Sequence, residues 1–215
     1  MRPALDPSTF DLRLLTFDLT PAYLCSRYSL LCNESGKAYE SAVWGVAKEA
    51  IVIVDMLNGF LEPGNPLYCG DGARAIIPNV VSLLSSKPDA ARIFVCDSHT
   101  KSDPEFGIFP PHCIEGTEEA RVVPELEAFP GRIVRKRTFD GFFGTDLADV
   151  LGGLAPDKVY AVGVCTDICV LYTVAGLRLR GYEVIVPRNC VASFDKDSHK
   201  WALRHFVDVL GAEVA

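Results

Sequence analysis

The chain has 215 residues, the size of one ordinary domain, and 49% of them are hydrophobic. This is enough apolar material for a sizeable core, so extensive intrinsic disorder is excluded. The formal net charge of −7, without any basic block, argues against nucleic acid as a partner, and no apolar run approaches the roughly 18 residues of a membrane span. We therefore expect a soluble protein that binds neither nucleic acid nor membranes, and, since no secretory signal is visible, a cytoplasmic one.

The first 48 residues differ in pattern from the rest of the chain. They carry five acidic and five basic residues, so the whole net charge belongs to residues 49–215. Their apolar residues follow neither a period of 2 nor one of 3.6. We interpret residues 1–48 as an N-terminal extension of unassigned structure and residues 49–215 as one domain.

From residue 50 onward, short apolar runs alternate with amphipathic segments. Runs typical of strands buried on both faces occupy residues 50–55, 91–96, 132–135, 158–163 and 183–187, and a short strand is expected at 212–215. Helical spacing of apolar residues is found at 76–84, 145–151, 166–180 and 197–210. The alternation predicts an α/β fold: three layers, α/β/α, around a mostly parallel, six-stranded, Rossmann-like sheet.

Turn and cap residues predict where two of these helices begin and end. Thr145 is the expected cap of the helix over 145–151, and Gly152 and Gly153 are expected to stop it. Gly181 is a suitable residue to close the helix over 166–180.

Chemically active side chains follow four of the expected strands. Ligands of open parallel sheets bind beyond the carboxyl ends of the strands. These ends carry Asp55, Asp97, Lys136 and the segment from Gly163 to Cys169. Each residue alone is explained equally well as a turn cap or a solvated end, but together they predict an active site at one rim. No GxGxxG follows the first strand, which disfavours dinucleotide binding.

Cys169 is the candidate nucleophile among eight cysteines, none of which forms a CxxC pair. We expect no disulfide scaffold. Cys169 lies in the first turn of an expected helix, where the helix dipole favours a thiolate, and a Lys136 cation would lower its pKa further. Asp55 is a candidate acceptor for its proton. The backbone N–H groups of Cys165 and Cys169 are candidates for an oxyanion hole, whereas the Cys165 thiol is interpreted as a small group in a tight turn.

Asp97, His99 and His112 form a candidate metal site. Asp-x-His on an extended strand end points both side chains to one side, and Pro110-Pro111 presents His112 rigidly. Carboxylate and imidazole ligands suit one divalent Zn, Mn or Fe ion, with water in the open positions. Glu105 is a candidate for a further contact.

Two other histidines, His199 and His205, lie in the last expected helix. We interpret both as packing or surface residues.

Residues 50–215 resemble the isochorismatase-like cysteine hydrolases, and among them the nicotinamidase (pyrazinamidase) branch. The resemblance is carried by the segments IVIVDMLNGF (51–60), DSH (97–99), IFPPHCIEGT (108–117), RKRTFDGFFGTDL (135–147) and AVGVCTDICVLYT (161–173). It implies a metal-dependent cysteine amidohydrolase that converts nicotinamide to nicotinate and ammonia through a thioester. It also favours a homo-oligomer.

The resemblance also implies roles for individual residues. The catalytic triad falls on Asp55, Lys136 and Cys169. The metal ligands fall on Asp97, His99 and His112, and Glu105 falls where some bacterial members place a further acidic ligand or a water contact.

The same resemblance describes the surroundings of the thiol. Val164–Cys165 takes the position of a non-proline cis peptide that turns the oxyanion-hole N–H groups inward. Phe60 and Phe109 fall on the aromatic walls of the nicotinamide pocket, with Phe109 standing where the family often has Trp.

Two alternatives stay open from the sequence. The same thiol chemistry serves another small amide equally well. A non-enzymatic thiol sensor or scaffold using Cys165 and Cys169 is a different class of function, but it leaves Lys136 and the metal set without a purpose. The vinyl-ether reaction of isochorismatases is disfavoured, because those members lack this metal set.

Overall fold

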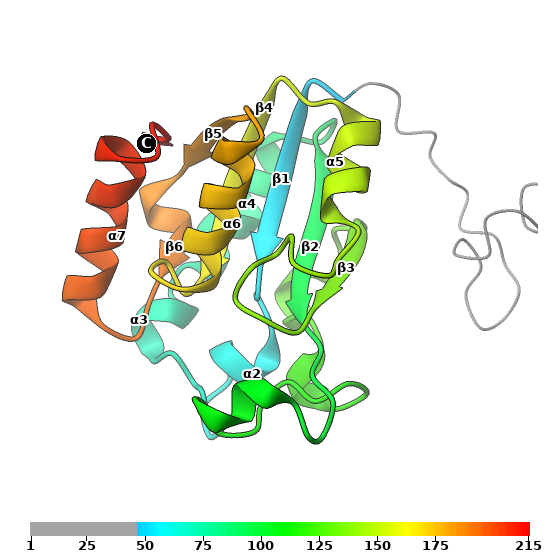
Figure 1. The fold of residues 1–215 in the computed structure, drawn as a ribbon, viewed down its shortest axis with the longest axis vertical. Coiled ribbons are helices and arrows are strands. Elements are labelled where there is room, and N and C mark those ends of the chain that lie inside the picture. Colours follow the sequence, from blue (N-terminus) through cyan, green and yellow to red (C-terminus); the bar gives the residue numbers. More distant parts are fainter. Residues whose placement is uncertain (1–46) are drawn as a thin grey trace, which may run out of the picture. The chain divides into compact units, whose positions relative to one another are not determined.

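The computed structural model describes residues 47–215 (Figure 1). The extension expected over residues 1–48 lies, except for its last two residues, outside the described residues. The division of the chain at residue 48 therefore stays a prediction. No helix within residues 47–215 is both long enough and apolar enough to cross a membrane.

A parallel sheet of seven strands forms the centre of the described residues, in the order β3-β2-β1-β4-β5-β7, with β6 paired to β4. The strands are β1 Glu49–Val54, β2 Ala91–Asp97, β3 Arg132–Lys136, β4 Lys158–Val164, β5 Glu183–Val186, β6 Val191–Ala192 and β7 Glu213–Val214. All six expected strands are present. The additional strand β6 has two residues, too few to give a sequence pattern.

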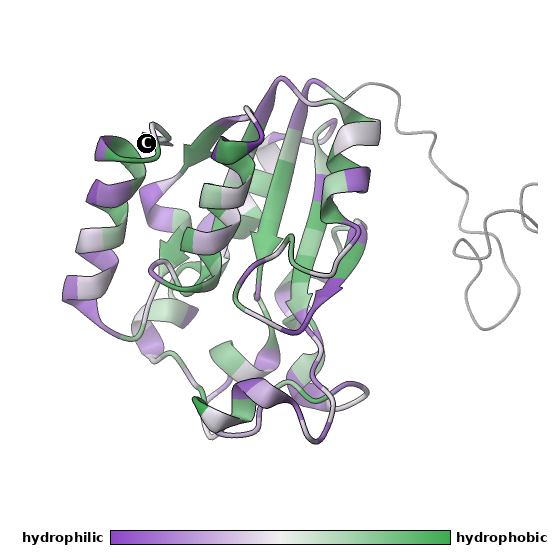
Figure 2. Cartoon of the chain, in the orientation of Figure 1, coloured by the Kyte–Doolittle hydropathy of each residue, from purple (hydrophilic) through white to green (hydrophobic). Residues whose placement is uncertain are grey.

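Helices cover both faces of the sheet, which confirms the expected three layers. On one face, α5 (Leu147–Leu154), α6 (Cys169–Leu179) and α7 (Lys196–Asp208) form one buried apolar cluster with the sheet, which includes Ala50, Val52 and Val54 of β1. On the other, α4 (Ile77–Ser86) packs against Ile51 and Ile53, with the short α2 (Asn58–Leu61) and α3 (Asp71–Arg74). Figure 1 shows α4 behind the sheet and α5, α6 and α7 in front of it. In Figure 2 the central strands are hydrophobic, whereas α7 has a hydrophilic outer face.

Both ends of α5 differ from those that Thr145, Gly152 and Gly153 predicted. The helix runs through Gly152 and Gly153 to Leu154, and Ala155 ends it in the left-handed conformation at φ 45°. Leu154 is buried, so the extra turn adds an apolar side chain to the core. At the other end Asp146 is the N-cap residue, and Thr145 contributes its Oγ1 as acceptor for the Leu147 N–H at 3.3 Å.

The helix α6 begins at Cys169, three residues later than expected. Thr166 does not enter the helix because its N–H donates to the Ala192 carbonyl at 2.9 Å, which ties residues 166–168 into a turn beside β6. The expected end is confirmed: Gly181 follows the helix at φ 86° and donates its N–H to the Arg178 carbonyl at 3.0 Å.

The strand order reverses direction between β1 and β4, so a crevice opens at their carboxyl ends. Asp55 follows β1 directly, and Cys165 follows β4 directly. The fold thus brings residues more than a hundred positions apart to one rim.

Candidate active site and metal-ligand cluster

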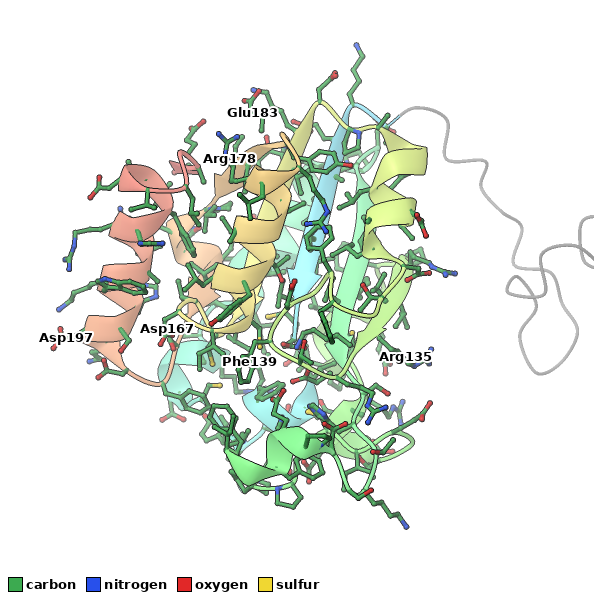
Figure 3. All side chains as sticks on the ribbon, viewed as in Figure 1. Arg135, Phe139, Asp167, Arg178, Glu183 and Asp197 are labelled. Carbon is green, nitrogen blue, oxygen red and sulfur yellow. The ribbon has the colours of Figure 1, made fainter. Side chains whose placement is uncertain are left out.

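Lys136 lies at the centre of a buried group of charges. The register of the sheet pairs it with Asp97 across β2 and β3, and its Nζ lies 2.5 Å from Asp97 Oδ1 and 2.7 Å from Asp55 Oδ2. The same Nζ is 3.5 Å from Cys169 Sγ. Figure 3 shows the preceding residue, Arg135, pointing outward, as the two-residue period of a strand requires. The structure thus brings together the three expected triad residues.

Burial and pairing separate the proton affinities of the two aspartates. Burial, reinforced by the charge of Asp97, raises the pKa of Asp55 to about 6 in spite of the Lys136 cation. Burial acts in the same direction on Asp97, but Lys136 and the two histidines outweigh it and hold the pKa of Asp97 below its usual range. Burial alone would lower the pKa of Lys136, yet the two carboxylates raise it well above its usual value. A stable Lys136–Asp97 ion pair therefore stands beside an aspartate that can exchange protons near neutral pH.

The expectation of a lowered Cys169 pKa is wrong. Cys169 does lie in the first turn of α6 and beside Lys136, which lowers its pKa as expected. Burial is the larger effect, however, and raises the pKa of the Cys169 thiol well above its usual value. The thiol is therefore protonated at rest and needs a base before it can act as a nucleophile. Asp55 is the candidate for this base.

The turn between β4 and α6 presents two free N–H groups. The Val164–Cys165 peptide bond is cis, as the resemblance implies. The Cys165 carbonyl accepts from the N–H groups of Ile168 and Val170, both at 3.1 Å. Within residues 47–215, no acceptor is found for the N–H of Cys165 or of Cys169. Both donors are thus available to a ligand.

Residues from the C-terminal part of the fold hold this turn in place. Thr166 Oγ1 and His199 Nδ1 are hydrogen-bonded at 2.9 Å, and Ser193 Oγ donates to the Asp167 carboxylate. His205, in contrast, stacks on Trp201 within α7. The sequence analysis missed the role of His199, because nothing in the spacing of residues 166 and 199 predicts their contact.

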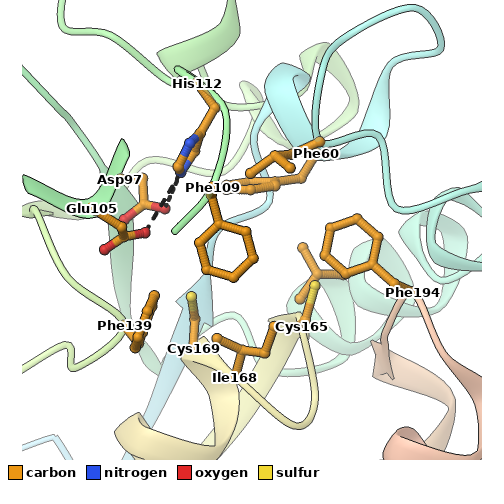
Figure 4. Close-up of a pocket in the computed structure, with 12 residues that line it drawn as sticks. Phe60, Asp97, Glu105, Phe109, His112, Phe139, Cys165, Ile168, Cys169 and Phe194 are labelled. Atoms are coloured by element: carbon orange, nitrogen blue, oxygen red, sulfur yellow. Dashed lines mark ion pairs between the residues drawn. The ribbon is translucent and has the colours of Figure 1, made fainter. Parts of the chain in front are cut away.

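Four side chains gather next to the triad as a metal-ligand cluster: Asp97, His99, Glu105 and His112, with ligand atoms within 4.8 Å of one another. His112 Nε2 lies 3.6 Å from Asp97 Oδ2 and 3.8 Å from Glu105 Oε1 (Figure 4). His99 Nε2 lies 3.6 Å from Asp97 Oδ1 and 4.0 Å from Glu105 Oε1. Both imidazoles thus direct Nε2 toward the same two carboxylates.

These residues fit a divalent cation. His99 is fully buried, and its Nε2, which faces Asp97 and Glu105, has no hydrogen-bond partner among the described residues. Burying a polar atom without a partner is costly, and a cation between the imidazoles and carboxylates satisfies such atoms. The Pro110 carbonyl lies 2.8 Å from His112 Nδ1, which leaves Nε2 of this ring for the cluster. Two nitrogen and two carboxylate donors suit zinc, manganese or iron.

A pocket that opens to solvent connects the thiol and the cluster (Figure 4). Cys169 lies at its base, and Asp97, Glu105 and His112 form one side. The two expected aromatic residues line it together with others that the sequence analysis missed: Phe60, Phe109, Phe139 and Phe194, with Leu67 and Ile168. Phe139 follows Lys136 by three residues, so its position near the carboxyl end of β3 could have been predicted from the sequence. Phe194 lies in the connection from β6 to α7, which no sequence pattern relates to the pocket.

The comparisons with known proteins agree with this geometry. Residues 49–215 match the family model of the isochorismatase domain. The fold is similar to the crystal structure of nicotinamidase PncA from Bacillus subtilis, with a TM-score of 0.73, 35% identity, and coverage of 78% of this chain and 99% of the other. It is also similar to the pyrazinamidase of Pyrococcus horikoshii in complex with zinc, with a TM-score of 0.72, 29% identity, and coverage of 78% and 98%. Maleamate amidohydrolase of Pseudomonas putida is 27% identical over 189 residues, 78% of this chain and 85% of that protein.

The fold and these similarities define an amidohydrolase of the α/β class. The chain belongs to the isochorismatase family. Within that family it is a nicotinamidase-like amidohydrolase.

Proposed function

We propose that this enzyme hydrolyses nicotinamide to nicotinate and ammonia through a thioester on Cys169. The observation that carries the proposal is one pocket in which a buried thiol, a proton-accepting aspartate and an imidazole–carboxylate cluster face the same aromatic-lined space. The similarity to nicotinamidase PncA of Bacillus subtilis supports the choice of substrate.

The first half of the reaction forms the thioester. Asp55 accepts the proton of Cys169, and the resulting thiolate attacks the carboxamide carbon of the substrate. The Lys136 cation, 3.5 Å from the sulfur, stabilises the thiolate during this transfer. The negative charge that develops on the amide oxygen is stabilised by the free N–H groups of Cys165 and Cys169. Asp55 then gives its proton to the departing nitrogen, which leaves as ammonia.

The second half of the reaction releases the acid. Asp55, again a carboxylate, removes a proton from water, and the hydroxide attacks the thioester carbon. The carbon–sulfur bond breaks, nicotinate leaves, and the proton returns to the Cys169 thiolate. Because the pKa of Asp55 is about 6, it can both accept and return a proton at neutral pH.

The cluster is the proposed site of one divalent metal ion, held by Asp97, His99 and His112 with Glu105 as fourth ligand. When bound, such an ion would supply a Lewis acid for the pyridine nitrogen of the substrate. The aromatic rings of Phe60 and Phe109 lie with their centroids 5.6 and 6.4 Å from that of His112. We propose that they hold the flat ring of nicotinamide beside the cluster.

A second candidate function is the hydrolysis of another small amide by the same thiol chemistry. The similarity to maleamate amidohydrolase favours it, since maleamate is an amide without a pyridine ring. The non-enzymatic thiol sensor is not retained, because the chain is an amidohydrolase.

The two candidates are separated by comparing nicotinamide with benzamide, which carries the amide but lacks the ring nitrogen. In metal-replete enzyme, kcat/KM measured by ammonia release should be at least about tenfold higher for nicotinamide than for benzamide. A tenfold ratio corresponds to the loss of one contact worth about 1.4 kcal/mol. A chelator should remove this preference. Equal kcat/KM for the two amides would contradict the proposed contact and favour the second candidate.

The thiol mechanism is tested separately with cysteine variants. Cys169→Ala should abolish turnover while keeping the fold, because removing one sulfur at a helix start changes little packing. Cys190→Ala removes a buried cysteine that does not line the pocket and serves as the matched control. Turnover by Cys169→Ala equal to that of Cys190→Ala would refute the thioester.

A further inference from the structure

Asp103 is a buried carboxylate that the mechanism above does not use. It lies between His99 and the 3-10 helix η2 (Pro104–Gly107), and its side chain is only 3% exposed. Its Oδ2 accepts a hydrogen bond from Arg137 Nε at 2.8 Å and lies 3.4 Å from His99 Nδ1. Its Oδ1 accepts from the Glu105 backbone N–H at 3.3 Å.

Each of these contacts reaches a different part of the site. His99 and Glu105 are two of the four candidate metal ligands, and Asp103 contacts both of them without entering the cluster. Arg137 directly follows Lys136, the central residue of the triad. One carboxylate therefore links two candidate ligands to the end of the strand that carries the catalytic lysine.

The two imidazoles of the cluster are held in different ways. The Pro110 carbonyl faces Nδ1 of His112, whereas the group facing Nδ1 of His99 is the Asp103 carboxylate. A carboxylate at the far nitrogen of a ligand histidine fixes the ring orientation and its tautomer, and it strengthens the near nitrogen as a donor. The near nitrogen, Nε2 of His99, faces the carboxylates of the cluster.

We propose that Asp103 is a positioning residue for the metal site: it orients His99 and anchors the segment that carries Glu105, and Arg137 holds it in place. The inference rests on the metal site of the proposed function and on no other part of it. It predicts that the charge of Asp103 matters for metal affinity even though Asp103 is not a ligand.

The test is the Zn²⁺ affinity of the full chain, measured by competition with a chromogenic chelator. Asp103→Asn keeps the size of the side chain but removes its charge, and it should weaken Zn²⁺ binding by roughly 10- to 100-fold. The matched control is Asp195→Asn. Asp195 is also an N-cap aspartate, accepting from the backbone N–H groups of Asp197 and Ser198 at 3.1 and 2.7 Å, but it caps α7 and is not part of the cluster. Asn caps a helix about as well as Asp, so both variants lose only the charge of a capping residue, and only a positioning role separates their Zn²⁺ affinities.

A second variant keeps the test decisive if Asp103→Asn does not fold. The Arg137 side chain is 54% exposed, so Arg137→Met should fold, and freeing the Asp103 carboxylate should weaken Zn²⁺ binding on the order of threefold. If the wild type binds Zn²⁺ and a folded Asp103→Asn variant binds it equally well, the inference is overturned and the proposed function stands. If Asp103→Asn does not fold and Arg137→Met binds Zn²⁺ as tightly as the wild type, the inference is also overturned. A wild type that does not bind Zn²⁺ overturns the metal site itself.

Discussion

Lys136→Met replaces the central cation of the site by an apolar side chain of similar length. Lys136 is 1% exposed and pairs with Asp55 and Asp97, which are equally buried. The substitution leaves two buried carboxylates without their shared partner. We expect a loss of both turnover and stability.

The size of the stability loss follows from the two carboxylates. Removing one partner of a buried ion pair costs about 3–5 kcal/mol. Asp55, with its pKa of about 6, relieves part of the cost by taking up a proton. Asp97 accounts for most of the lost stability, because Lys136 is the strongest of the influences that hold the pKa of Asp97 below its usual range. For a domain of this size a loss of 3–5 kcal/mol corresponds to a fall in Tm of roughly 6–20 °C.

Urea unfolding at pH 7 and pH 5 measures this loss and identifies its cause. Without the cation, the folded-state pKa values of the two aspartates rise above their unfolded values, so the folded variant binds more protons than the unfolded one. Its unfolding free energy should then increase as the pH falls, and the gap to the wild type should narrow by roughly 1–3 kcal/mol between pH 7 and pH 5.

Lys158→Met is the matched control on strand β4 of the same sheet. Lys158 pairs with Glu183 at 3.2 Å, but its side chain is 44% exposed, so its removal should cost at most about 1 kcal/mol. Equal losses in the two variants, or a Lys136→Met loss that does not change with pH, would refute the electrostatic reasoning.

Two further expectations concern the backbone and the turn beside the thiol. Gly163→Ala should lower the free energy of unfolding by more than about 4 kcal/mol, because the added Cβ would lie 1.9 Å from the Val54 carbonyl oxygen at a φ of 118°. Gly153→Ala, in open space within α5, should instead raise the free energy of unfolding by about 0.5–1 kcal/mol. Similar unfolding free energies for the two variants would contradict the packing argument. Burial lowers the pKa of His199, so the contribution of His199 to the unfolding free energy should be fully present above about pH 6.5 and be lost as the pH falls below it. His199→Gln should flatten this decline in urea unfolding between pH 7 and pH 5, and an unchanged slope would show that His199 is not its source.

The strands and the position of the site were predictable because both depend on short-range pattern. A strand buried on both faces needs an unbroken apolar run, and Ala50–Val54 provides one. The charged residue at the end of such a run must then lie at the carboxyl rim, which is how Asp55, Asp97 and Lys136 were found together.

The features that the sequence did not predict depend on long-range contacts. The start of α6 is set by the hydrogen bond from Thr166 to Ala192, and Phe194 enters the pocket from beyond β6. The pKa of Cys169 was misjudged because the helix start and the cation are visible in the sequence, whereas the depth of burial is not. The cytoplasmic location and the homo-oligomer stay predictions.

The register of the sheet has a consequence for the synthesis of the enzyme. Asp97 and Lys136 are direct neighbours across β2 and β3, and a slip of one residue would turn the lysine to the opposite face. The proposed base, Asp55, follows β1, whereas the proposed nucleophile, Cys169, begins α6, 114 positions later in the chain. A nascent chain on the ribosome therefore has no thiol beside its aspartate until α6 has been synthesised and the strands have paired correctly. The reactive centre forms only when folding is nearly finished, so partly folded chains carry no amidase activity.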